Sequence, residues 1–329
     1  MERPQEIHEY PVDYDADREP DWQYHELLDR IVRDGRITRS GMDEESKQIL
    51  GHVMYFDMEN GVPLITERDL MSSSRPENIE KWQTREQHEQ PFRYSAKQGL
   101  AEIIGFINGA RTVEELESYG CKWWHFWATE EKCAKRGLET GDLGPGSYGA
   151  AFHDFPMADG KTFNQFQAIV QQIRERPELR THIITPYIPY NLVRLEGQKQ
   201  QVVVVPCHGD LRFDVDTDAK EISLVHKQRS ADSPVGLPFN MIHYSALLTM
   251  MGQVTGYKPK QLVYMIDNAH IYKRHYEKVQ DEILTRDPKP FPRLKVDPNI
   301  VRLEDFRVEH FSVEEYDPHP PIDMEGTPV

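Results

Sequence analysis

Apolar residues recur along this chain with two different periods, which separate the expected helices from the expected strands. A period of three to four residues predicts helices over 21–33, 97–108 and 163–174. The segment 241–254 is apolar on most faces and is therefore expected to be a central helix.

Period-two alternation and β-branched runs predict strands over 181–185, 202–206, 211–215, 221–226 and 262–266. The stretch 51–64 is predicted to form paired strand segments around an Asn60-Gly61 turn. Strands and helices do not alternate regularly along the chain. We therefore expect an α+β fold, in which a mixed β-sheet has helices packed on one side.

Two segments show neither period. Residues 1–20 are rich in charge and proline and are expected to form an irregular N-terminal arm. Residues 68–95 are expected to form a long insert or lid, because long loops in compact domains are often functional. No break in composition divides the rest, so 21–329 is expected to be a single domain.

The overall charge narrows the class of partner. The 329 residues carry a formal net charge of −16, which argues against binding a nucleic acid polymer, although a few local arginines can still hold a small phosphate. Three cysteines are too few for a disulfide framework and favour a reducing compartment. No signal peptide and no apolar run of membrane-spanning length is recognisable, so a cytoplasmic protein with no membrane association is expected.

The strongest candidate for chemistry is Cys207, which follows the apolar run 202–206. Taken alone, such a cysteine is more often a buried structural thiol. A turn near 217–218 would bring Arg229 back beside it, and a guanidinium there is expected to lower the pKa of the thiol and activate it.

Several motifs accompany this cysteine in a fixed order along the chain. They are Pro206-Cys207-His208, Gln228-Arg229-Ser230-Ala231-Asp232, Gly236-Leu237-Pro238-Phe239-Asn240 and Asp267-Asn268-Ala269-His270-Ile271-Tyr272. With these motifs the chain resembles the thymidylate synthase family, and the resemblance extends from about Arg36 to the C-terminus. It implies a thymidylate synthase-like catalytic domain over 21–329 that dimerises through its sheet.

The resemblance also implies a mechanism. Cys207 would add to carbon 6 of a pyrimidine nucleotide, so that carbon 5 attacks the one-carbon unit of methylenetetrahydrofolate. Glu102 and Tyr148 would manage the protons, and Asp232 would lie at the pterin ring. A catalytic set of Cys207, Glu102, Tyr148 and Asp232 is thus implied.

The implied binding residues fall into two groups. Those for the nucleoside monophosphate are Arg39, Arg180, Arg229, Ser230, Asn240, His270, Tyr272 and His208, and those for the folate are Trp124, Trp127, Asp232 and Gly236. In the family, Arg180 reaches across the homodimer to the partner's phosphate. Asn240 offers a donor and an acceptor to the pyrimidine edge and favours uracil, although a flipped amide would suit cytosine.

The chain also departs from the family pattern. Arg36 to Gly41 replace a glycine-rich phosphate loop, leaving Arg39 as the favoured arginine, and Thr181 replaces a second cross-dimer arginine. Glu67 reverses a charge where a folate tail would lie. Because these changes lie away from Cys207, retained covalent chemistry with a changed outcome is expected, namely hydroxymethylation of dUMP, dCMP or CMP. A true thymidylate synthase and a non-catalytic nucleotide-binding relative are the alternatives.

Two unrelated site types are less favoured. A Cys-His hydrolase using Cys207 and His208 is disfavoured, because neighbours on a strand point to opposite faces. Zinc binding by Cys121, His125 and Cys133 lacks a fourth ligand at an accepted spacing. We therefore expect no metal.

Overall fold

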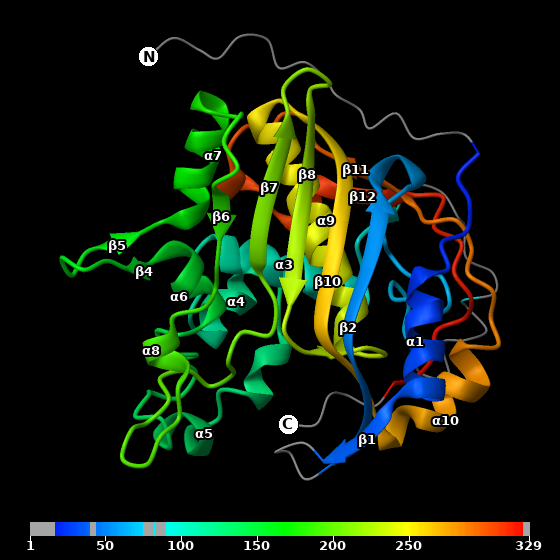
Figure 1. Ribbon diagram of the computed structural model, residues 1–329, viewed down its shortest axis with the longest axis horizontal. Coiled ribbons are helices and arrows are strands. Elements are labelled where there is room, and N and C mark those ends of the chain that lie inside the picture. Colours follow the sequence, from blue (N-terminus) through cyan, green and yellow to red (C-terminus); the bar gives the residue numbers. More distant parts are fainter. Residues whose placement is uncertain (1–16, 40–43, 75–81, 83–89, 325–329) are drawn as a thin grey trace.

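The computed structural model describes residues 17–39, 44–74, 82 and 90–324. Its central sheet has the strand order β1 (Arg36–Arg39), β2 (Glu45–Asp57), β10 (Lys258–Tyr272), β8 (Glu221–Gln228), β7 (Asp210–Asp216) and β6 (His182–Ile184), with β9 (Ala231–Asp232) also paired to β10. Strand β10 runs parallel to β8 and β9, whereas the other pairs are antiparallel. The sheet is therefore mixed, as predicted (Figure 1).

In Figure 1, the long helices α9 (Gly236–Thr255) and α3 (Tyr94–Ile107) lie behind the strands of this sheet. Helix α7 (Gln165–Glu175) lies beside β6, and α1 (Gln23–Asp34) lies beside β2. Helix α9 packs on β8 and β10, and α3 packs on α9. This arrangement confirms the predicted α+β class, and the four predicted helices are present with ends shifted by a few residues.

Shorter elements surround this two-layer core. They are α4 (Val113–Tyr119), α5 (Glu130–Ala134), α6 (Tyr148–His153), α8 (Pro189–Leu192), α10 (Tyr276–Lys278), a small sheet of β11 (Arg293–Val296), β12 (Phe311–Glu314) and β3 (Gln90–Pro91), and the pair β4 (Phe155–Pro156) and β5 (Thr162–Phe163). Within the described ranges, no helix is both long enough and apolar enough to cross a membrane.

Strand β8 changes character along its buried face. Alternate side chains point toward the helices, and they are Ile222 and Leu224 followed by His226 and Gln228. The first two belong to the hydrophobic core, whereas the last two are polar and fully enclosed. The end of β8 thus supplies buried polar groups at the point where the chain continues into Arg229.

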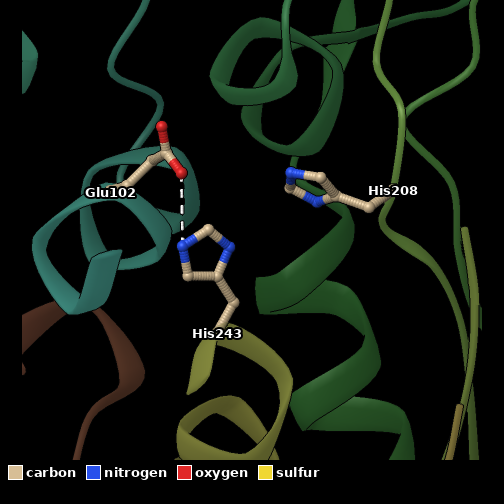
Figure 2. A group of neighbouring side chains, drawn as sticks. All are labelled: Glu102, His208 and His243. Carbon is tan, nitrogen blue, oxygen red and sulfur yellow. Dashed lines mark ion pairs between the residues drawn. The ribbon is translucent and has the colours of Figure 1, made fainter. Parts of the chain in front are cut away.

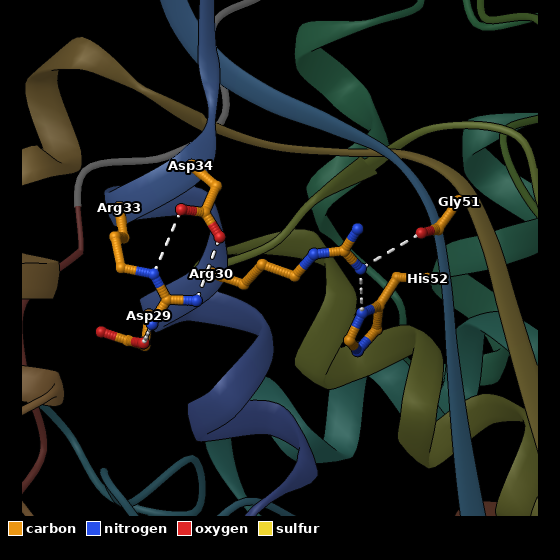
Figure 3. Close-up of polar contacts among 6 residues, drawn as sticks. All are labelled: Asp29, Arg30, Arg33, Asp34, Gly51 and His52. Atoms are coloured by element: carbon orange, nitrogen blue, oxygen red, sulfur yellow. Dashed lines mark hydrogen bonds and ion pairs between the residues drawn. The ribbon is translucent and has the colours of Figure 1, made fainter.

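Helix α1 is held beside β2 by a polar contact (Figure 3). Arg30 Nη1 donates to the carbonyl of Gly51 at 3.3 Å and lies 3.2 Å from Nδ1 of His52. The neighbouring ion pair between Arg33 and Asp34 is exposed and contributes little to stability.

The predicted strand over 202–206 is not formed. Val202 and Val203 are buried, as an apolar run suggests, but the segment is an irregular loop that leads into β7. Its backbone is satisfied without a strand partner, since Val203 donates to the carbonyl of Leu143. Pro206 has no N–H to offer a neighbouring strand.

The prediction of paired strands over 51–64 is also wrong. Strand β2 runs without a break to Asp57, and a short 3-10 turn over Met58–Asn60 ends it. Gly61 has a φ of 94°, a left-handed conformation that favours glycine, so the chain does turn at the predicted position. It does not, however, return as the second strand of a hairpin.

The segment predicted to be a lid begins inside the molecule. Residues 66–71 are buried, and Arg68 Nη2 donates to the carbonyl of Pro234 at 2.6 Å. Glu67 is 1% exposed, so it does not lie on an open surface as the expectation of a folate tail required. The rest of the predicted insert falls largely on 75–81 and 83–89, and most of the predicted arm on 1–16; both lie outside the described residues.

We predict that Glu67 makes stability depend on pH. Burial raises the pKa of Glu67 to about 7 from its usual 4.5, so its share of stability is complete below 4.5 and is lost as pH rises through 7. Between about pH 4 and pH 8, wild type should lose up to about 3 kcal/mol of unfolding free energy relative to Glu67→Gln in urea titrations. The exposed control Glu114→Gln should behave as wild type, and parallel curves for wild type and Glu67→Gln would contradict the prediction.

Candidate active site

The structure places Arg229 beside Cys207, as the sequence predicted. Strands β7 and β8 are antiparallel with Asp210 opposite Lys227, and this register continues into the residues that flank them. The N–H of Arg229 donates to the carbonyl of Cys207 at 2.8 Å, and Arg229 Nη2 lies 3.4 Å from the sulfur.

The guanidinium of Arg229 also binds the loop that holds the thiol. Its Nε donates to the carbonyl of Pro206 at 2.7 Å, and its Nη2 donates to the carbonyl of Val205 at 2.8 Å. Charged hydrogen bonds of this kind are stronger than neutral ones. One side chain therefore both fixes the loop and places positive charge at the sulfur.

The net effect on the thiol differs from the prediction. Burial raises the pKa of Cys207, while the charge of Arg229 and the contact with Tyr148 lower it by less. Arg229 acts in the expected direction, but the overall direction is upward. With its pKa raised above the usual value, the protonated thiol is the favoured form of Cys207 at neutral pH.

Tyr148 and His208 complete the surroundings of the thiol. The N–H of Cys207 donates to the hydroxyl of Tyr148 at 2.6 Å, and the ring of Tyr148 stacks on that of His208 at 4.4 Å. His208 Nδ1 is hydrogen-bonded to the hydroxyl of Tyr244. Burial lowers the pKa of His208 well below its usual value, and among the described contacts none joins its ring to the sulfur, so a Cys-His hydrolase gains no support.

Glu102 is buried on α3 and is held by indole groups. The Nε1 groups of Trp123 and Trp124 both donate to Glu102 Oε1. His243, on α9, places its Nε2 at 3.2 Å from Glu102 Oε2 (Figure 2). Trp124, which was predicted to bind the folate, thus shares Glu102 with Trp123, which was not predicted. The other predicted tryptophan, Trp127, has the Nζ of Lys132 at 5.2 Å from the centre of its ring.

Three of these side chains could hold a cation. Glu102, His208 and His243 each offer one ligand atom, and these atoms lie within 4.8 Å of one another (Figure 2). Within the described ranges this is the group that qualifies, so the weighed zinc set of Cys121, His125 and Cys133 does not come together. The two indoles already occupy one oxygen of Glu102, which favours a hydrogen-bonded arrangement over a metal site.

Asn240 lies on α9 within a group of amides. Gln228 Nε2 donates to Asn240 Oδ1 at 3.0 Å and to the carbonyl of Ser230 at 2.9 Å. The hydroxyl of Tyr264 donates to Gln228 Oε1. Asn240 Nδ2 lies 3.5 Å from Nδ1 of His243, three residues further along the same helix.

His270 and Tyr272 lie at the end of β10, where β9 pairs with it. His270 is opposite Asp232 in that ladder, and its ring contacts the ring of Tyr272 edge-on at 5.0 Å. Burial lowers the pKa of His270 to about 4 and raises the pKa of Tyr272 to about 12, so both are neutral at pH 7. The structure thus groups Asp232 with two of the residues predicted to bind the nucleotide.

Two predicted residues lie apart from this group. Arg39 is exposed in β1, opposite Glu45, and Arg180 is exposed just before β6. Among the described contacts, neither makes a hydrogen bond or ion pair with the residues around Cys207. Gly236 opens α9, and no atom lies within 4 Å of the position that a Cβ would take there.

In a comparison with known protein families, the family described as thymidylate synthase matches residues 92–327, which is well over half of the chain. The chain belongs to the thymidylate synthase family. The predicted resemblance is confirmed over that range, while residues 36–91 lie outside the match. Members of this family are one-carbon transferases, which act at carbon 5 of a pyrimidine nucleotide and use methylenetetrahydrofolate as cosubstrate.

Sequence reasoning missed several residues of the site. They are Trp123, His226, Gln228, His243 and Tyr244, which lie against predicted residues, and Tyr264, which is hydrogen-bonded to Gln228. One signal was available in the sequence. His243 follows Asn240 by three positions, which places both on the same side of an otherwise apolar helix.

We predict that Arg229 controls the reactivity of Cys207. In Arg229→Gln, loss of the positive charge should raise the thiol pKa further and slow alkylation by iodoacetamide at pH 8 by roughly tenfold. Labelling is quantified on the Cys207 peptide by mass spectrometry, which separates it from the buried Cys121 and Cys133. Arg212→Gln, on the exposed side of β7, should label at the wild-type rate. Equal rates for Arg229→Gln and wild type would reject the assignment.

Proposed function

We propose that this protein is a pyrimidine nucleotide hydroxymethylase, in which water rather than hydride completes the one-carbon transfer. The observation that supports the outcome is the buried pair of Glu102 and His243. A carboxylate facing an imidazole can accept a proton from water. The pair lies close to the predicted nucleophile, because ligand atoms of Glu102, His243 and His208 lie within 4.8 Å of one another and His208 directly follows Cys207 in the chain.

The proposed nucleotide site is built on Arg229. Its Nε and Nη2 hold the loop carbonyls, and among the described residues no hydrogen bond occupies its Nη1. That nitrogen and the neighbouring Ser230 suit a phosphate oxygen. His208 would lie along the base, Asn240 would bind the edge of the base, and His270 with Tyr272 would bind the sugar. Arg39 would add a second charge at the phosphate.

The residues also fit a folate. Trp124 is buried beside Glu102, Asp232 is half-buried at β9, and the open space at Gly236 leaves room above the start of α9. We propose that these three, with Trp127 at the rim, hold methylenetetrahydrofolate. When bound, it supplies the one-carbon unit at the oxidation level of formaldehyde.

The chain's own residues would act as follows. The thiol of Cys207 loses its proton and its sulfur bonds to carbon 6, which makes carbon 5 nucleophilic. Carbon 5 would then bond to the one-carbon unit. Tyr148 and Glu102, through water, would remove the proton from carbon 5 as the bond between that unit and the folate nitrogen breaks, so that tetrahydrofolate leaves and an exocyclic methylene remains on the pyrimidine. An oxygen of water then bonds to the exocyclic methylene of the pyrimidine, and Glu102, which His243 faces, takes the proton that the water loses. The bond from sulfur to carbon 6 then breaks to release the hydroxymethyl nucleotide.

A homodimer formed through the sheet completes the proposal. The face of the sheet away from α9 exposes apolar side chains, among them Val53 and Tyr55 on β2, Met265 on β10 and Ile183 on β6. Exposed apolar patches of this kind mark association surfaces. Arg180 precedes β6 at the edge of that sheet, and we propose that it reaches the phosphate of the other protomer.

The product distinguishes the alternatives. Incubation with methylenetetrahydrofolate and each of dUMP, dCMP, UMP and CMP should give a product heavier than the methyl product by one oxygen, without the absorbance of dihydrofolate. Cys207→Ser should give none. A methyl product with dihydrofolate would identify a true thymidylate synthase, and nucleotide binding without any product would identify a non-catalytic relative.

We predict that inactive subunits complement each other. Arg180→Ala lacks the cross-subunit charge and Cys207→Ser lacks the nucleophile, so each should be inactive or nearly so alone. After mixing and subunit exchange, one site of each heterodimer has both groups, and activity should return to roughly a quarter of wild type by the statistics of pairing. Absence of recovery, with exchange verified by native mass spectrometry, would place Arg180 outside the partner's site.

A further inference from the structure

The amide of Gln228 has only one possible orientation. Its Nε2 lies 2.9 Å from the carbonyl oxygen of Ser230, and a carbonyl can only accept. The nitrogen must therefore face Ser230, which leaves Oε1 for the hydroxyl of Tyr264. The second hydrogen on Nε2 points to Asn240 at 3.0 Å.

This orientation fixes Asn240 in turn. Because Gln228 donates, the atom of Asn240 that faces it must be Oδ1, so Nδ2 is directed to Nδ1 of His243 at 3.5 Å. His243 Nδ1 then accepts, and the ring hydrogen lies on Nε2, which is 3.2 Å from Glu102 Oε2 (Figure 2). Each group in this series has a single consistent direction.

His243 is costly as a core residue. It is fully buried on α9, where most of the buried residues are apolar, and among the described residues its Nε2 faces nothing but the carboxylate of Glu102. A buried polar group without full hydrogen bonding costs free energy. An aliphatic residue would suit the packing of α9 better, so the imidazole is better explained by its two polar neighbours.

We propose that His243 is a positioning residue that holds the amide of Asn240 in one orientation and thereby selects a pyrimidine with a 4-oxo group. The inference rests on the proposed function, because it requires a pyrimidine bound at Asn240. The nitrogen of the amide lies on the side of Glu102, which would act at carbon 5. The substituent on carbon 4, adjacent to carbon 5, therefore meets an N–H donor, while N3 meets Oδ1.

This pattern matches uracil and opposes cytosine. Uracil offers an acceptor at O4 and a donor at N3, whereas cytosine offers a donor at N4 and an acceptor at N3. A free asparagine could turn its amide over and bind either base. Held by Gln228 at one end and His243 at the other, Asn240 would leave cytosine facing two mismatched groups.

Two substitutions separate the two contacts of His243. His243→Asn keeps an oxygen near the position of Nδ1, so it retains the acceptor for Asn240 while losing reach to Glu102. His243→Gln reaches Glu102 but removes that acceptor. The test is calorimetry without folate, which would give the dissociation constants of dUMP and dCMP, and of UMP and CMP, so that the two members of each pair can be compared. The value of kcat/KM would be determined for each nucleotide as well.

In the wild type, the uracil nucleotide of each pair should bind more tightly. His243→Gln should lower this preference by roughly tenfold, the worth of one buried hydrogen bond, whereas His243→Asn should retain it. Ser245→Ala, a buried substitution on the same helix whose hydroxyl bonds only within α9, should leave the preference unchanged. A general loss of stability would weaken binding of both bases equally and leave the ratio where it was.

Several results would overturn the inference. A wild-type preference for cytosine would do so, as would an unchanged ratio in a folded His243→Gln. Should both His243 variants fail to fold, Gln228→Met decides, because it removes the donor that holds Oδ1 of Asn240 and should lower the preference in the same direction; an unchanged ratio there rejects the inference. If wild type binds none of the four nucleotides, the proposed function fails and this inference fails with it, which is distinct from binding without base discrimination.

Discussion

The guanidinium of Arg229 determines where the candidate nucleophile lies. The loop before β7 has no strand partner at Val205 and Pro206, so its carbonyls depend on a side chain from the next strand. The same guanidinium lies 3.4 Å from the sulfur of Cys207. Position and charge therefore come from one group, and neither can be altered without the other.

Burial and activation oppose each other at this site. Enclosing Cys207 raises its pKa by more than Arg229 and Tyr148 lower it. The nearby imidazoles follow the same physics, since burial lowers the pKa of His208 and of His226 well below the usual value. The candidate site is thus a set of largely neutral donors and acceptors around one fixed positive charge, which suits precise hydrogen bonding to a neutral base.

Periodicity predicted the fold well and the irregular parts poorly. Helices α3, α7 and α9 and strand β8 follow directly from the spacing of apolar residues. The valines at 202–205 did not form a strand, because hydrophobicity reports burial and not whether an N–H meets a neighbouring strand. The contact of Trp123 with Glu102 was missed for a related reason: the short 3-10 turn over Trp123–Phe126 has no amphipathic period from which to infer direction.

Much of the candidate site was predictable only because motifs mark it. The proximity of Cys207 and Arg229 follows from a hairpin that the sequence shows, since β7 and β8 are joined by a short turn. None of these motifs includes His243. Its position three residues after Asn240 on a mostly apolar helix is recognisable from the sequence. Its two partners, however, come from α3 and from its own helix, and only the packing of α3 on α9 brings them together.

The buried segment 66–71 extends these constraints to the start of α9. Arg68 is enclosed and donates to the carbonyl of Pro234, two residues before the helix begins, and it interacts electrostatically with Asp232. Because Asn240 lies on the second turn of α9, the direction of its amide depends on how that end is held. Glu67 is itself buried and interacts electrostatically with Arg68. Its influence on the site therefore passes through Arg68, and not through a surface that a folate tail would touch.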